Sequence, residues 1–161
     1  MPAPRILVTA FEPFLHYAEN SSQLCLRKLE QQPPGGMELL TRVYPVQFEM
    51  VRAALPLDLA APIAASLHLG QSGQRNRLQL EMFALNIGGE PHQSASEYFP
   101  LEAAGPPAYR SPLPLQSWAA ALHDAGLPVE VSFHAGTYLC TATSYWAQHF
   151  NQLNARAIPS L

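Results

Sequence analysis

Residues 129–150, VEVSFHAGTYLCTATSYWAQHF, constrain the fold more than any other stretch of this chain. The β-branched and aromatic residues Val129, Val131 and Phe133 predict a short strand. Gly136 predicts a turn after it, and the aromatic-rich sequence that follows predicts a helix. A strand that turns directly into a helix is the arrangement on which α/β folds are built.

Cys140 falls in or near the first turn of this expected helix. Unpaired N–H groups and the helix dipole favour the thiolate there, and the thiolate is the nucleophilic form. We therefore expect a reactive Cys140 with a lowered pKa, although a buried structural cysteine is the alternative. Cys25 lies between two leucines on another expected helix, and we expect an inert packing residue.

The rest of the chain alternates strands and helices in the same way. We expect a kink or an end of the second helix at Pro56. The expected strands cover residues 5–9, 39–44, 63–69 and 78–87, and the expected helices cover residues 20–32, 46–55 and 115–124. This order predicts an α/β fold with three layers, α/β/α, around a mostly parallel central sheet.

Three loops of this fold are candidates for one shared site. Residues 11–14, 70–73 and 136–140 each follow an expected strand. In parallel sheets the carboxyl ends of the strands face the ligand, so these loops can converge. We see no internal repeat and no linker, which predicts a single domain over residues 1–161.

Composition restricts the partners and the compartment. Charged residues make up 13% of the 161 residues and the net charge is −3, so we expect neither nucleic acid nor a membrane surface as a partner. Two cysteines in different contexts predict reduced thiols and a cytoplasmic location. The start of the chain has no signal-peptide pattern, and no apolar run approaches the ~20 residues that cross a bilayer.

Two motifs carry a resemblance to a known family. His134–Cys140, HAGTYLC, between a strand and a helix, is similar to the nucleophile motif of the pyroglutamyl peptidase I (pyrrolidone carboxyl peptidase) family of cysteine peptidases. Ile6–Phe14, ILVTAFEPF, resembles that family's first strand and the loop after it. Further matches occur in order at RVYPV (42–46), LGQSG (69–73) and LEMFALN (80–86), so the resemblance spans nearly the whole chain.

The resemblance implies a phosphorylase/hydrolase-like fold and the removal of N-terminal pyroglutamate from peptides. It implies pyroglutamyl peptides as substrates and no cofactor, and it leaves room for a homo-oligomer. In this family a cysteine attacks the pyroglutamyl carbonyl, a histidine moves the proton, and a carboxylate orients the histidine. The motifs place Cys140 and Glu81 in the first and third roles. Without the resemblance, Glu81 would be read as an exposed carboxylate on a strand.

The resemblance also implies a substrate pocket. Phe11 and Phe14 match the aromatic pair that packs against the lactam ring, and Asn20 and Gln71 match polar positions near it. Each residue has a structural alternative. The aromatic pair can be core packing at a strand end, Asn20 can be a helix cap, and Gln71 can make a loop hydrogen bond.

Several positions depart from the family pattern. Met82 follows Glu81 where the family usually has arginine, and Leu15 stands where glycine normally follows the FEPF motif. Residues 87–93, IGGEPHQ, replace a DARIPDN-like loop. These differences affect the residues expected to close over the substrate.

No histidine matches the catalytic histidine, which the family carries on a strand some two dozen residues beyond the cysteine. His149 lies nine residues after Cys140, or ~13 Å along the expected helix, which exceeds a hydrogen bond. His134 precedes the turn, and a contact with Cys140 has no support in the sequence. The other histidines have no partner at metal-ligand spacing, so we expect no metal: His16, His68, His92 and His123.

Two interpretations follow. The chain is a truncated form that lacks the family's last strand and helix, or it is a degenerate relative that binds a small ligand or a protein partner without peptidase activity. The retained Cys140, Glu81, Phe11 and Phe14 favour the peptidase. The absent histidine and the replaced loop favour the inactive alternative.

Overall fold

A computed structural model describes residues 2–73, 76–90 and 93–161. Strands and helices alternate through most of this part of the chain. In order the elements are β1 Arg5–Phe11, α1 Ser21–Gln31, β2 Glu38–Tyr44, α2 Phe48–Leu59, β3 Ala65–His68, β4 Leu78–Leu85, the 3₁₀ turn η1 Ala95–Glu97, β5 Ala108–Arg110, α3 Leu115–Asp124, β6 Val129–His134 and α4 Leu139–Leu153. Each expected strand and helix is present, with bounds that shift by a few residues.

The strands form two three-stranded sheets. In the first, β1 lies between β2 and β3, and both pairs are parallel. In the second, β4 lies between β5 and β6, with β6 parallel and β5 antiparallel. The short strand β5 was not predicted. A three-residue segment is too short to show a period of two, so its sequence gives no strand pattern.

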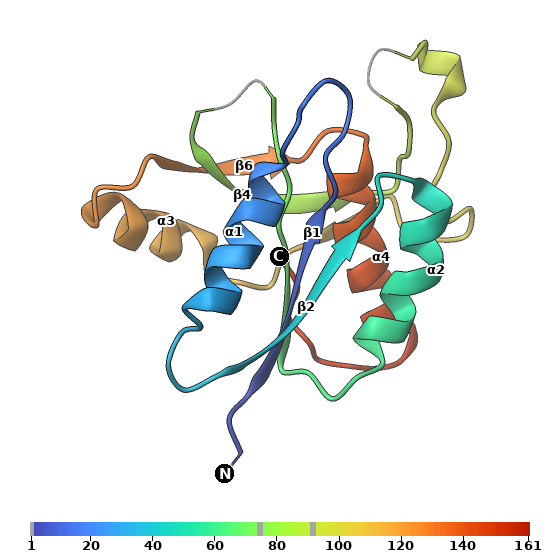
Figure 1. Cartoon of the computed structure of the whole chain (residues 1–161). Coiled ribbons are helices and arrows are strands. Elements are labelled where there is room, and N and C mark those ends of the chain that lie inside the picture. Colours follow the sequence, from blue (N-terminus) through green and yellow to red (C-terminus); the bar gives the residue numbers. More distant parts are fainter. Residues whose placement is uncertain (1, 74–75, 91–92) are drawn as a thin grey trace.

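Helices cover both faces of the strands, which confirms the three-layer α/β/α prediction (Figure 1). Successive side chains of a strand point to opposite faces. On β1, Leu7 and Phe11 therefore join the core beneath α2 and α4, whereas Val8 and Ala10 pack with Leu26 of α1. The helices α1 and α3 lie on one side in Figure 1, and α2 and α4 lie on the other.

Residues 159–161 run alongside β3. The N–H of Ser66 donates to the carbonyl of Pro159, and the N–H of His68 donates to the carbonyl of Leu161. Ser160 pairs with Ser66 in parallel orientation, and its carbonyl also accepts from the Ser111 hydroxyl, next to β5. This segment therefore lies between the two sheets, as the position of the C label in Figure 1 shows.

The prediction that the second helix could end at Pro56 is wrong, because α2 contains Pro56 and continues to Leu59. Leu55 and Leu59 are both fully buried, on either side of Pro56. Their burial stabilises the last turn by an estimated ~2–3 kcal/mol per side chain, enough to offset the hydrogen bond that proline cannot donate. Within the described part of the chain, no helix is long and apolar enough to span a membrane.

Candidate active site

The loops after β1, β3, β4 and β6 meet at the carboxyl ends of these strands, as predicted for three of them (Figure 1). Gln71 Oε1 accepts from the Ser21 N–H at 2.6 Å, which joins the loop after β3 to the start of α1. The Gly89 N–H donates to the Thr137 carbonyl at 2.9 Å, which joins the loop after β4 to the turn before α4. Gly136 in this turn has a φ of 79°, a conformation that favours glycine.

Cys140 is the second residue of α4, so the predicted position in the first helical turn is confirmed. Its Sγ packs directly on Gly70, the second residue after β3. A Cβ at position 70 would lie 2.5 Å from Sγ, and glycine is the residue that permits this approach. The hydroxyl of the neighbouring Thr141 accepts from the Leu85 N–H at 3.2 Å, which fixes the start of α4 on β4.

The expected lowering of the Cys140 pKa is wrong for the chain as it stands. Burial and the charge of Glu81 raise the pKa of the Cys140 thiol to about 11. A hydrogen bond from its own backbone N–H, of the kind a helix start provides, lowers the pKa but is the weakest of the three effects. The loss of hydration therefore raises the pKa of the thiol by more than the hydrogen bond at the helix start lowers it.

Glu81 lies within electrostatic range of Cys140, as its effect on the thiol pKa requires. Its Oε2 atom is buried, so the alternative of an exposed strand carboxylate does not hold. Glu81 stands on β4 opposite Ser132 of β6. The structure therefore brings together the two side chains that the family motifs place in catalytic roles.

No histidine among the described residues hydrogen-bonds the Cys140 thiol. His68 bonds Thr9 Oγ1 at 2.8 Å and Ser66 Oγ at 3.2 Å. His149 bonds the Tyr109 hydroxyl at 2.8 Å, and the exposed His134 accepts from the Gly136 N–H at 3.1 Å. His16 and His123 are exposed, and His92 lies outside the described residues.

Neither does the described part of the chain hold three metal-ligating side chains close enough together to bind one ion. Among the described residues, the two candidate catalytic groups are the Cys140 thiol and the Glu81 carboxylate. Both charged forms are negative, so each disfavours the other.

The four residues proposed for substrate binding occupy two kinds of position. Phe11 is buried in the core cluster against which Cys140 packs, 6.5 Å from the Tyr44 ring. Phe14 is half-buried, with its ring 5.6 Å from that of Tyr17. Asn20 caps α1, because its Oδ1 accepts from Ser22 N–H and its Nδ2 donates to the Glu12 carbonyl. Core packing, the cap and the loop hydrogen bond of Gln71 are therefore all present.

Leu15, which departs from the family pattern, has a φ of 54°. This left-handed conformation costs a residue with a Cβ about 1–2 kcal/mol relative to the right-handed one. The side chain is 78% exposed, so it buries little apolar surface that could offset that cost. Glycine would adopt the same loop without the penalty.

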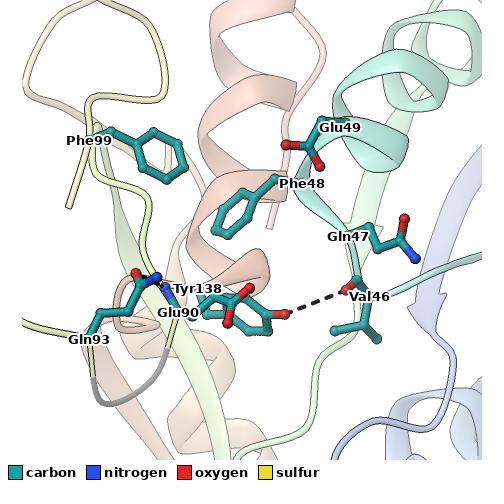
Figure 2. A pocket seen from close by; sticks show the side chains of 8 residues that line it. All are labelled: Val46, Gln47, Phe48, Glu49, Glu90, Gln93, Phe99 and Tyr138. Atoms are coloured by element: carbon teal, nitrogen blue, oxygen red, sulfur yellow. Dashed lines mark hydrogen bonds between the residues drawn. The ribbon is translucent and has the colours of Figure 1, made fainter. Parts of the chain in front are cut away.

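Sequence reasoning missed a cavity of about 230 Å³ that is lined in part by Tyr138 (Figure 2). Tyr138, two residues before Cys140, forms one wall. The start of α2 and the loop after β4 form the others, and the lining residues are Val46, Gln47, Phe48, Glu49, Glu90, Gln93, Phe99 and Tyr138. Their distance along the chain gives no sequence signal, apart from the proximity of Tyr138 to the nucleophile motif.

A cysteine at a helix start, near a buried carboxylate at the carboxyl ends of strands in a three-layer α/β fold, is the arrangement expected of a cysteine hydrolase. The sequence profile of the pyroglutamyl peptidase family matches residues 4–159. The chain therefore belongs to the pyroglutamyl peptidase family.

Individual relatives agree. A pyrrolidone-carboxylate peptidase of Coprothermobacter proteolyticus is 33% identical over 155 residues, covering 93% of this chain and 75% of that protein. Pyrrolidone-carboxylate peptidase 1 of Photorhabdus laumondii is 34% identical over 150 residues, covering 89% and 68%. The crystal structure of the Fervidobacterium islandicum pyrrolidone carboxyl peptidase superposes with a TM-score of 0.88 at 25% identity, covering 98% of this chain and 78% of that one.

Proposed function

We propose that this chain is a single peptidase-like domain of an enzyme type that removes N-terminal pyroglutamate from peptides, with Cys140 as the nucleophile and with a need for a histidine base beside it. The observation that carries the proposal is the placement of the Cys140 thiol at the start of α4, on Gly70 and within range of Glu81. The family membership supports this reaction, and the geometry supports Cys140 as the nucleophile and Glu81 as the acid that orients the base.

The chemistry needs a base that the described residues do not offer at Cys140. A histidine beside Cys140 would supply it, and we propose to place one there on a strand added after residues 159–161. These residues run parallel to β3 and end beside His68, two positions before Gly70. A strand that continues in this direction leads toward the Cys140 thiol. Glu81 would then orient the imidazole and stabilise its protonated form.

Such an imidazolium would reverse the electrostatics of the site. At present the negative Glu81 raises the pKa of Cys140. A positive ring between them attracts both the thiolate and the carboxylate, so it lowers the pKa of the thiol.

The reaction then balances in two steps. The thiol proton passes to the imidazole, sulfur bonds to the pyroglutamyl carbonyl carbon, and the C–N bond breaks as the imidazolium returns the proton to the leaving amine. Water, activated by the same imidazole, cleaves the thioester and restores the thiol.

For the pyroglutamyl ring we propose a site formed by Phe14 and the edge of Phe11. A flat, neutral lactam needs apolar walls and a few hydrogen-bonding groups. Asn20 shapes this loop as a cap, and Gln71 holds the loop after β3 against it. Binding of 2-pyrrolidone should then shift the backbone amide signals of residues 10–15 and 70–73 together.

The test is turnover of pyroglutamyl-aminomethylcoumarin. We expect near-background activity from the 161 residues, and a gain of at least ~10²-fold from a form extended by a histidine-bearing strand. The same extension with glutamine in place of the histidine, and the Cys140→Ala variant of the extended form, are the matched controls. Robust Cys140-dependent turnover by the 161-residue chain would contradict the assignment of the base.

A second candidate is a catalytically inactive family member that binds a small amide or a protein partner. The raised pKa of Cys140 and the hydrogen bonds that occupy His68 and His149 elsewhere favour it. No turnover by the extended form, together with retained 2-pyrrolidone binding, is the result that selects this candidate. A homo-oligomer and a cytoplasmic location stay predictions.

A further inference from the structure

The cavity beside Tyr138 has a chemistry that a neutral lactam does not require (Figure 2). Phe48, the first residue of α2, is one of its lining residues and lies between Phe99 and Tyr138. The Phe48 ring meets the Phe99 ring at 5.4 Å and the Tyr138 ring at 5.3 Å, both edge to face. The cavity is therefore bounded by three aromatic rings from three separate segments of the chain.

Two carboxylates flank these rings. Figure 2 shows Glu49 and Glu90 on opposite sides of Phe48. Glu90 lies near Tyr138, since its charge adds to burial in raising the pKa of the Tyr138 hydroxyl. The amide side chains of Gln47 and Gln93 complete the polar part of the lining.

Neither carboxylate has a cationic partner within residues 2–73, 76–90 and 93–161. The ion pairs of this part of the chain join Arg5 to Glu38, Arg42 to Asp58, Arg52 to Glu102 and Arg77 to Glu130. Two negative charges in a cavity lined by aromatic rings form an environment that attracts an organic cation, because the carboxylates attract it and a ring face adds to the attraction.

The cavity is also fixed relative to the nucleophile. Gly88 and Phe99 exchange two backbone hydrogen bonds, which holds these two residues side by side. Gly89 then donates to the Thr137 carbonyl, immediately before Tyr138. A side chain at Gly89 would meet the Tyr98 ring at 2.0 Å, so glycine is needed for this close attachment.

We propose that this cavity receives the ammonium or guanidinium group of a basic residue in a peptide substrate, held by Glu49 and Glu90 against Phe48 and Tyr138. The proposal rests on the peptidase function proposed above and names its substrate class: pyroglutamyl peptides with a lysine or arginine side chain within reach of Cys140. Glu90 and Gln93, from the stretch that stands where the family has its DARIPDN-like loop, belong to the lining of this subsite, as does Phe99.

Binding can be measured without turnover. The probes are acetyl-arginine amide and its neutral isostere acetyl-citrulline amide, titrated into the 161-residue chain while backbone amide signals are followed. We expect the arginine probe to bind about tenfold more tightly and to shift the signals of Gln47, Glu90 and Tyr138. Equal affinities, or shifts confined to other residues, would overturn the proposal.

Charge variants sharpen the measurement. The double variant Glu49→Gln and Glu90→Gln should bind the arginine probe no better than the citrulline probe. Asp124→Asn, which removes an exposed carboxylate at the end of α3, is the matched control and should retain the tenfold preference. Loss of the preference in Asp124→Asn would mean that net charge, and not the cavity, attracts the probe.

A final arm separates a peptide subsite from a site for free cations. In the Cys140→Ala variant, which consumes no peptide, pyroglutamyl-arginine amide should bind more tightly than acetyl-arginine amide, because one molecule fills both pockets. Equal affinities would overturn the substrate assignment. Failure of the peptidase proposal has a different signature, which is no hydrolysis by the histidine-extended form while the arginine preference persists.

Discussion

The sheet β2-β1-β3 and the sheet β5-β4-β6 present polar groups of different kinds near the active site. Around the first sheet, Thr9, His68, Ser66 and Ser160 form a chain of buried or half-buried hydrogen bonds. On the second sheet and the helix packed on it, Glu81 and Cys140 are two acids whose charged forms oppose each other.

The polar groups of the first sheet thus have a structural role, whereas those of the second sheet are candidates for catalysis. A buried polar chain whose members bond one another keeps neutral side chains neutral and holds the strands in register. A carboxylate that raises the pKa of a neighbouring thiol acts on the chemistry instead, because it disfavours the thiolate, which is the nucleophilic form. The first sheet therefore contributes structural support to the site. The second sheet and α4 carry Glu81 and Cys140, the two candidate catalytic groups.

The largest expected effect tests the hydrogen-bonded chain of neutral side chains around the first sheet. Burial lowers the pKa of His68 to about 4, below the ordinary 6.5, so the folded state favours the uncharged ring. The contribution of His68 to stability is fully present above pH 6.5 and is lost as the pH falls toward 4. The loss is at most about 3 kcal/mol, since the side chain keeps some solvent exposure.

Urea unfolding of the chain between pH 7.5 and pH 4.5 measures this loss. The His68→Asn variant should show a smaller decrease in the free energy of unfolding over that range. His123→Asn, which changes an exposed histidine on α3, is the control and should keep the wild-type slope. An unchanged slope in His68→Asn would mean that other groups set the acid sensitivity.

The second effect tests the pair of acids, Cys140 and Glu81, at the second sheet. With a pKa of about 11 instead of 9.0, Cys140 has about a hundredfold less thiolate at pH 8 than an ordinary thiol. Iodoacetamide labelling of the Cys25→Ser variant should therefore accelerate up to about pH 11. Glu81→Gln should move that profile to lower pH by part of the shift, because burial, the larger cause, remains. Half-maximal labelling below pH 9 would contradict a pKa of Cys140 that burial and Glu81 raise.

The contrast also shows what the sequence can predict. Local patterns predicted β1, α3 and α4 well, because apolar periodicity and glycine turns act over a few residues. Motif order predicted that Cys140 and Glu81 meet. The pKa of Cys140 was predicted with the wrong sign, since burial and a charge 59 positions away along the chain exceed the effect of its own helix.

Long-range packing accounts for the other differences. Cys25 was expected to be an inert packing residue, yet it is exposed on α1, because the helix turns Leu26 and not Cys25 toward β1. The cavity around Phe48 joins segments near residues 48, 90 and 138, and no local pattern links them. The pairing of residues 159–161 with β3 is likewise a contact between distant parts of the chain.

The smallest effect tests the contact between Gly70, in the loop after β3, and Cys140 of α4. A Gly70→Ala Cβ would lie 2.5 Å from Cys140 Sγ, so either the thiol or the loop after β3 must move. We expect a loss of about 2 kcal/mol in the free energy of unfolding, as for other overpacked sites, and a changed rate of Cys140 labelling. Gly35→Ala is the matched control, since a Cβ there meets no atom within 4 Å and should leave stability equal or slightly higher. If Gly70→Ala were as stable as Gly35→Ala and left Cys140 labelling unchanged, the thiol would not pack on β3's loop. The nucleophile would then be positioned by the second sheet alone, and the first sheet would contribute no surface to it.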